Sequence, residues 1–95
     1  MILGMVTGTV VATQKVDNVG GAKYLLVNKC DEHGTVKNDF YVALDQVGAG
    51  HGDMVMMAQG SPNRQTERTV DRPIDTSILG IIDLIGKGDT VAYKK

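Results

Sequence analysis

The sequence is poor in the residues from which many catalytic and nucleic-acid sites are built. Its 95 residues include four aromatic residues, two histidines and one cysteine. A single thiol excludes an internal disulfide framework and is typical of a protein kept in a reducing compartment. Four aromatic side chains are too few for a platform on which bases stack. The composition therefore favours neither a disulfide-stapled secreted domain nor a base-stacking protein.

An excess of charge and a long apolar run are also missing. Ten basic and eleven acidic residues give a net charge of −1, so no broad positive field attracts nucleic acid or an anionic membrane. No apolar run approaches the roughly 18 residues of a membrane span, and Met1 to Met5 lacks the charged start of a secretion signal. We expect one soluble, cytoplasmic domain over residues 1–95, with a modest core.

No cluster of side chains indicates a metal site, a cofactor site or a nucleophile. His33 and His51 lie in separate predicted loops, without cysteines or carboxylates at metal-ligand spacing. Cys30 precedes Asp31 and Glu32, whose negative charges would raise the pKa of the thiol. No motif pairs an acid with a base. We therefore expect no metal, no cofactor, no catalytic residue and no enzymatic activity.

What the chain does have is glycine at three alternate positions, Gly48, Gly50 and Gly52. A dinucleotide-binding loop needs its third glycine one residue later and a helix after it, whereas Met54 to Gln59 is typical of a strand. An exposed turn would carry Asn, Asp or Ser next to its glycines, where this chain has Val47 and Ala49. We therefore expect the loop to be partly buried. An ordinary hairpin turn remains the alternative.

Alternating apolar residues predict an all-β fold of short strands. The expected strands are Ile2–Thr13, Lys23–Cys30, Phe40–Asp45, Met54–Gln59 and Ile78–Ile85, with a short last strand at Thr90–Tyr93. The polar segment from Ser61 to Pro73 predicts one short helical turn. Short, closely spaced strands favour a small antiparallel barrel, closed or partly open, because closure removes exposed edges.

Short motifs follow one another in a fixed order along most of the chain. They are Gly4-x-Val6-x-Gly8-x-Val10-x-Ala12-Thr13-x-Lys15, Asp45-x-Val47-Gly48-Ala49-Gly50-x-Gly52, Gly60-Ser61-x-x-Arg64, and Pro73-x-Asp75 before Gly80-Ile81-Ile82-Asp83. From Met1 to Asp83 this series resembles the EutN/CcmL family, the vertex proteins of bacterial microcompartment shells. The family often has Ser-Ala where this chain has Pro62-Asn63.

The resemblance implies a five-stranded OB-like barrel that assembles as a ring, usually a pentamer. Such rings occupy the corners of a polyhedral shell, so the implied partners are copies of the chain itself and hexameric shell proteins. The family's members are structural parts, and the resemblance brings no catalytic residue. The runner-up hypothesis is an OB-fold module that binds an oligonucleotide or another ligand.

The same resemblance points to residues at the interface between copies or at the five-fold axis. Small residues suit a place where copies of one loop converge, and an arginine suits forked hydrogen bonds to a neighbour. Alternatively the glycines make an ordinary turn and the arginine is a solvated charge. The candidate residues are Val47, Gly48, Ala49, Gly50, Gly52, Gly60, Ser61 and Arg64.

Overall fold

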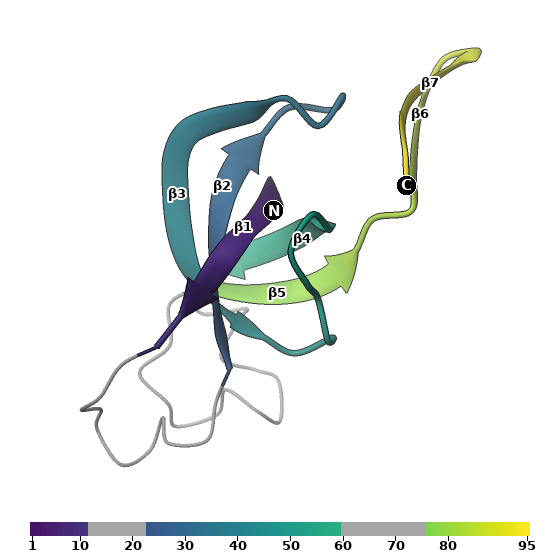
Figure 1. Cartoon of the computed structure of the whole chain (residues 1–95). Coiled ribbons are helices and arrows are strands. Elements are labelled where there is room, and N and C mark those ends of the chain that lie inside the picture. Colours follow the sequence, from purple (N-terminus) through teal and green to yellow (C-terminus); the bar gives the residue numbers. More distant parts are fainter. Residues whose placement is uncertain (12–22, 60–75) are drawn as a thin grey trace.

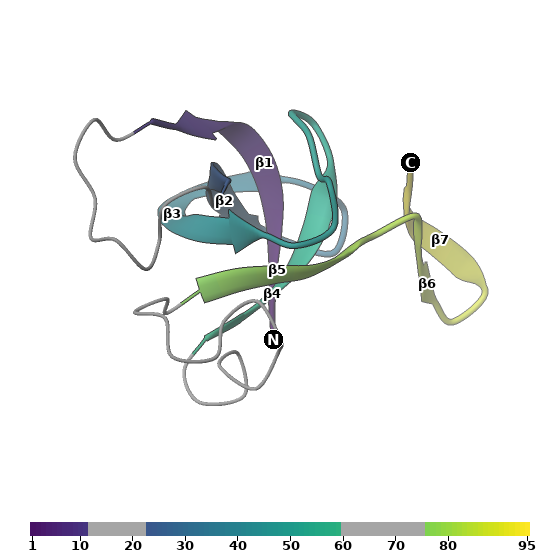
Figure 2. The same cartoon turned by 90° about the horizontal axis from the view of Figure 1, so that it is seen from below.

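The computed structural model describes residues 1–11, 23–59 and 76–95, and this part of the chain forms seven strands (Figure 1). Five of them close into a barrel in the order β1-β2-β3-β5-β4, and β6 and β7 form a separate hairpin outside the barrel (Figure 2). The strands are β1 (Ile2–Val10), β2 (Tyr24–Cys30), β3 (Val36–Asp45), β4 (Met54–Gln59), β5 (Thr76–Ile81), β6 (Leu84–Lys87) and β7 (Thr90–Lys94).

One pair of neighbouring barrel strands is parallel, which corrects the purely antiparallel barrel expected from the sequence. β3 and β5 run in the same direction, with Leu44 opposite Ser77 and Asp45 opposite Ile78. The other four neighbouring pairs of the barrel are antiparallel. Directions cannot alternate all the way around a closed ring with an odd number of strands. A five-stranded closed barrel must therefore contain a parallel pair.

Most predicted strands are confirmed, with changes at their ends. β4 has the predicted bounds, whereas β3 begins at Val36 and not at Phe40. The single strand predicted over Ile78–Ile85 is divided, because β5 ends at Ile81 and β6 begins at Leu84, outside the barrel. The helical turn expected between Ser61 and Pro73 lies outside the described residues, as does the expected end of the first strand at Thr13.

The core lies inside the barrel. It is formed mostly by the side chains that point inward as successive residues of each strand alternate between its two faces. Burying one such aliphatic side chain contributes about 1.5 to 3 kcal/mol relative to leaving it exposed. Backbones also approach closely here: a Cβ at Gly4 would collide with the Val27 side chain and lie 3.0 Å from the Asn28 carbonyl oxygen. The core residues are Val6, Leu25, Val27, Ala43, Ala49, Val55, Met57 and Ile78.

The two halves of β3 differ in burial. Ala43, Leu44 and Asp45 at its end are buried, whereas every residue from Val36 to Phe40 is exposed. The middle of β3 lies on the side of the barrel away from the β6–β7 hairpin (Figure 1), whereas β3 begins next to the turn at residues 31–35, in which Glu32 and His33 contact that hairpin. The strand β3 therefore runs from an exposed segment, which starts beside this turn, into the core of the barrel.

Candidate functional site: the glycine loop

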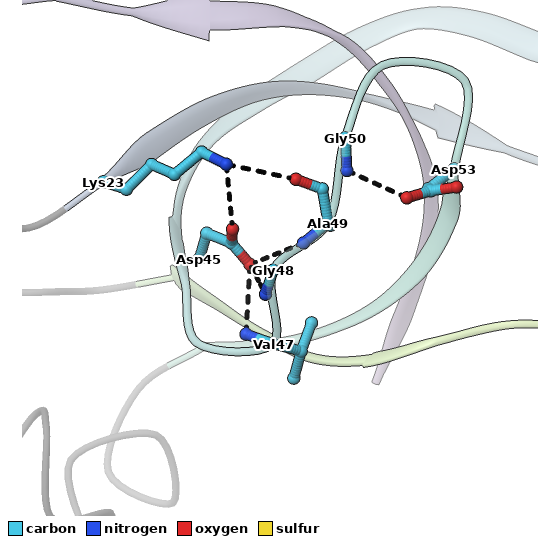
Figure 3. Close-up of polar contacts among 7 residues, drawn as sticks. All are labelled: Lys23, Asp45, Val47, Gly48, Ala49, Gly50 and Asp53. Atoms are coloured by element: carbon cyan, nitrogen blue, oxygen red, sulfur yellow. Dashed lines mark hydrogen bonds and ion pairs between the residues drawn. The ribbon is translucent and has the colours of Figure 1, made fainter.

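The glycine loop comprises residues 46–53 between β3 and β4. The carboxylate of Asp45, the last residue of β3, binds the backbone of this loop (Figure 3). Asp45 Oδ1 accepts hydrogen bonds from the backbone N–H groups of Val47 at 3.1 Å, Gly48 at 3.0 Å and Ala49 at 3.2 Å. The aspartate is only 5% exposed. A buried carboxylate is costly unless donors surround it, and here the loop supplies them. The first half of the loop is thereby held in one conformation.

Lys23 completes this network from the start of β2. Its Nζ lies 3.5 Å from Asp45 Oδ2 and donates a hydrogen bond of 3.3 Å to the Ala49 carbonyl oxygen. The Asp45 N–H in turn donates to the Lys23 carbonyl oxygen at 2.9 Å. Because 58% of the lysine side chain is exposed, its charge keeps contact with water. The sequence offered no signal for this contact between residues far apart in the chain.

A second aspartate closes the other half of the loop. Asp53 Oδ2 accepts the Gly50 N–H at 2.8 Å, and the Asp53 N–H donates to the Gly50 carbonyl oxygen at 3.0 Å. The Gly50 N–H is the main reason that the pKa of Asp53 lies below its usual value, and the positive charge of Lys95 adds to the effect. Backbone hydrogen bonds of 2.9 Å join Gly52 and Asp53 to Val6 of β1.

Burial or backbone conformation within a single copy of the chain explains why three of the loop residues are small. Ala49 is 1% exposed and belongs to the barrel core, which confirms that the loop is partly buried, although against its own barrel. Gly48 and Gly52 have φ values of 79° and 87°, a region that residues with a side chain rarely adopt. These positions therefore require small residues or glycine even in a single copy.

For two other residues predicted at the interface between copies, neither burial nor backbone conformation within the chain explains the choice of residue. Val47 leaves 39% of its surface exposed. A Cβ at Gly50 would find its nearest neighbour, Asp53 Oδ2, at 3.9 Å, which is an ordinary contact. The remaining predicted residues, Gly60, Ser61 and Arg64, lie outside the described residues.

The described residues contain no group of three or more His, Cys, Asp or Glu side chains that could hold a metal ion. None of the described segments is a helix long and apolar enough to cross a membrane. The Cys30 thiol is buried, and burial, with a smaller effect from Asp31, raises its pKa. A thiol in this environment is a poor nucleophile.

Comparison with known proteins places this barrel and loop in a family. A family profile described as "Ethanolamine utilisation protein EutN/carboxysome" matches residues 1–83. The carboxysome shell vertex protein CcmL of Synechocystis sp. is 41% identical over 95 residues, which are 100% of this chain and 95% of that protein.

Two solved structures are similar to the chain over most of its length. CcmL of Nostoc sp. has a TM-score of 0.95 and 40% identity, with 100% of both chains covered. The GrpN pentameric microcompartment shell protein of Rhodospirillum rubrum has a TM-score of 0.82 and 37% identity, covering 92% of this chain and 99% of that one. The chain therefore belongs to the EutN/CcmL family.

Proposed function

We propose that this chain is a structural vertex protein of a bacterial microcompartment shell, located in the shell and hence in the cytoplasm. The observation that carries the proposal is similarity over the full length to proteins named as shell vertex proteins, together with the same barrel. Its role is to contribute shape and closure, and it is not an enzyme. Flat sheets of hexagonal tiles cannot close into a polyhedron, so five-fold pieces are needed at the corners.

The chain acts as a homopentamer in this proposal. A relative with the same barrel is named a pentameric shell protein. A ring needs two different complementary surfaces on each copy, and a small barrel gains burial from such contacts. The partners of the ring are hexameric shell proteins, which it contacts weakly per subunit but several times per ring, so that multivalency supplies the attachment.

Val47 and Gly50 are the described loop residues that we assign to the interface near the five-fold axis. Neither side-chain burial nor a positive φ determines the size of these two residues, unlike that of Gly48, Ala49 and Gly52. The two aspartate networks hold the loop in place, so no further ordering entropy is lost when copies meet. We place Gly60, Ser61 and Arg64 in the same interface on the strength of the family motif alone.

Native mass spectrometry of the full chain tests the assembly directly. The wild-type chain is expected to be a pentamer at micromolar concentration, and a monomer would contradict the proposal. Gly50→Val tests the loop assignment and should weaken assembly while the barrel still folds. Gly8→Val is the matched control, because its nearest neighbour would also lie 3.9 Å from the new Cβ and neither glycine has a positive φ. Equal assembly of both variants and the wild type would refute the loop assignment.

Deleting the gene tests the role in the shell. We expect unsealed or elongated shells, while the enclosed enzymes keep their intrinsic activity. Closed, impermeable shells in a strain without any other vertex protein would contradict the proposed role. Oligonucleotide binding that weakens with salt would instead support the runner-up hypothesis of an OB-fold binding module.

A further inference from the structure

The β6–β7 hairpin contacts two loops of its own barrel (Figure 1). One is the 31–35 turn, which comprises residues 31–35 between β2 and β3, and the other is the glycine loop. These loops are separate in the sequence, and the pairing of β6 with β7 joins the two contacts. A two-stranded hairpin is marginally stable alone, so its position depends on what holds it at these loops.

Polar groups of the 31–35 turn face the hairpin. His33 Nδ1 lies 3.1 Å from the Ala92 carbonyl oxygen of β7. Lys87 Nζ, at the end of β6, lies 3.5 Å from Glu32 Oε2. The Lys87 and Glu32 side chains are 66% and 45% exposed, so water competes for this ion pair and it is readily broken.

An aromatic ring packs against the same turn. Gly34 has a φ of 87°, and a Cβ placed on it would lie 3.3 Å from the Tyr93 ring. So short a distance means that the ring lies directly on the backbone of the turn. The 31–35 turn therefore holds β7 by an apolar contact as well as by polar ones.

The end of the hairpin contacts the glycine loop. Lys95 Nζ lies 3.4 Å from Asp53 Oδ1. The Lys95 N–H donates to the Asp83 carbonyl oxygen at 3.0 Å, which ties this lysine to the base of the hairpin. The same base is joined to the barrel beside Asp53, because the Ile82 N–H donates to the Met54 carbonyl oxygen at 2.7 Å.

The Asp53 carboxylate is shared between the hairpin and the loop. Its Oδ1 faces Lys95, and its Oδ2 accepts the Gly50 N–H at 2.8 Å (Figure 3). Both contacts favour the ionised carboxylate, since the Gly50 N–H and then Lys95 lower the pKa of Asp53. The two oxygens belong to one rigid group, so a movement of the carboxylate toward or away from Lys95 also changes its hydrogen bond to Gly50.

The first half of the glycine loop is held by a different set of residues. Asp45 accepts the N–H groups of Val47, Gly48 and Ala49, and its other oxygen faces Lys23. The two halves of the loop therefore have separate supports. The Gly48 amide reports on the first support, and the Gly50 amide reports on the second.

We propose that the hairpin acts as a strap whose docking on the 31–35 turn fixes the second half of the glycine loop through Lys95 and Asp53. When the hairpin opens locally, Lys95 leaves the carboxylate and the Gly50 N–H is released to water more often. The coupling is reciprocal, so a weakened Asp53 contact also loosens the hairpin. It acts within one copy of the chain and thus goes beyond the proposed function.

Amide hydrogen exchange in the full-length protein tests the contact at the loop. Lys95→Met keeps the aliphatic stem and should raise the exchange rate of the Gly50 amide by about two- to fivefold, the range expected for an exposed ion pair. The Gly48 amide should keep its wild-type rate. Lys94→Met is the matched control, because Lys94 is exposed and has no ion-pair partner among the described residues.

A variant at the other end of the strap tests transmission through the hairpin. Lys87→Met removes the ion pair with Glu32 and should raise the Gly50 exchange rate by up to about twofold. In a Lys95→Met background the same substitution should add nothing, because the link to Asp53 is already broken. An equal effect of Lys87→Met in both backgrounds would overturn transmission through Lys95.

The reverse direction is tested at Asp53. Asp53→Asn removes the charge that faces Lys95 and should raise the exchange rate of the Lys95 amide, which bonds to the base of the hairpin. Asp39→Asn is the control, since Asp39 is an exposed carboxylate on β3. A Lys95 amide that exchanges at the wild-type rate in Asp53→Asn would contradict the reciprocal coupling. Circular dichroism checks that every variant folds.

The outcomes separate this inference from the proposed function. A wild-type monomer would refute the pentamer but not the coupling, which the same exchange rates measure within a single copy. A wild-type Gly50 exchange rate in Lys95→Met would overturn the coupling and leave the pentamer intact. An equal rise in Lys94→Met would also overturn the coupling, because the loss of any charge on the hairpin would then have the same effect.

Discussion

Two turns of this chain are organised by the same device, an aspartate at or just after the end of a strand, yet they differ in burial. After β2, Asp31 Oδ1 accepts the N–H groups of His33 and Thr35, both at 2.9 Å. After β3, Asp45 Oδ1 accepts three N–H groups of the glycine loop. Asp31 lies at the surface, whereas Asp45 is 5% exposed and has Lys23 beside it.

The comparison shows that one local motif contributes unequally to stability in two environments. At Asp31, water can replace the carboxylate if it is removed. At Asp45, removal leaves buried or half-buried donors and an alanine, Ala49, that belongs to the core. The energetic importance of a turn therefore follows from what the turn carries into the core, more than from the number of its hydrogen bonds.

The largest expected effect is at the buried aspartate. Asp45→Ala should lower the free energy of unfolding by about 2 to 4 kcal/mol, because the loop N–H groups lose a charged acceptor and Ala49 loses its fixed position. Denaturant unfolding of the full chain measures this value. A loss below about 1 kcal/mol would show that water replaces the carboxylate as easily here as at the surface.

A smaller effect is expected for the lysine of the same network. Lys23→Met keeps the aliphatic stem and removes the charge from the ion pair with Asp45. Because the lysine side chain is 58% exposed, the loss should stay below about 1 kcal/mol. A double-mutant cycle with Asp45→Ala measures the coupling between the two side chains. Additive losses would mean that the aspartate acts through the backbone N–H groups alone.

The third prediction uses pH to test the hydrogen bond between Asp53 and Gly50 in the second half of the loop. The folded pKa of Asp53 is lowered, so its contribution is complete above the unfolded value of about 3.9 and is lost as pH falls below it. The Gly50 amide proton should shift in the NMR spectrum over this acidic range. Asp53→Asn should abolish that shift, and a Gly50 amide that titrates unchanged in this variant would contradict the assignment.

The smallest effect is expected at Asp31. Asp31→Ala should lower the melting temperature only slightly, far less than Asp45→Ala, because solvent reaches the turn. The pKa of Asp31 is lowered chiefly by the Thr35 N–H, so any stabilisation it gives is present above its unfolded pKa and fades as the pH falls. Equal losses for the two alanine variants at neutral pH would remove the distinction between the turns.

Local patterns were enough to predict most of the strands and the partial burial of the glycine loop. β4 kept its predicted bounds because turn residues frame a continuous apolar run. The existence of a parallel pair was also predictable from the odd number of strands, although parity does not tell that β3 and β5 form it. The fully antiparallel barrel was wrong because the closing pair was not considered.

Other features depend on contacts that no local pattern records. Lys23 and Asp45 are far apart in sequence, so their ion pair arises from barrel closure. The pattern predicts one strand through Ile82 and Asp83, yet the chain leaves the barrel after Ile82, whose N–H donates to the Met54 carbonyl oxygen. The hairpin that follows therefore could not be assigned from alternation.

The parallel seam between β3 and β5 has a consequence for how the barrel forms. Its two residue pairs join segments that are separated by all of β4 and by the residues on either side of it. The β1–β4 pairing, which joins Ile2 to Met57, closes a longer stretch of chain, but it contains four residue pairs, so the β3–β5 seam has the fewest residue pairs to offset its closure entropy. We therefore expect the antiparallel strands to pair first and this seam to close last during folding. In the folded protein the same seam should open first, so that its amides exchange with deuterium before those of the β1–β2 pairing.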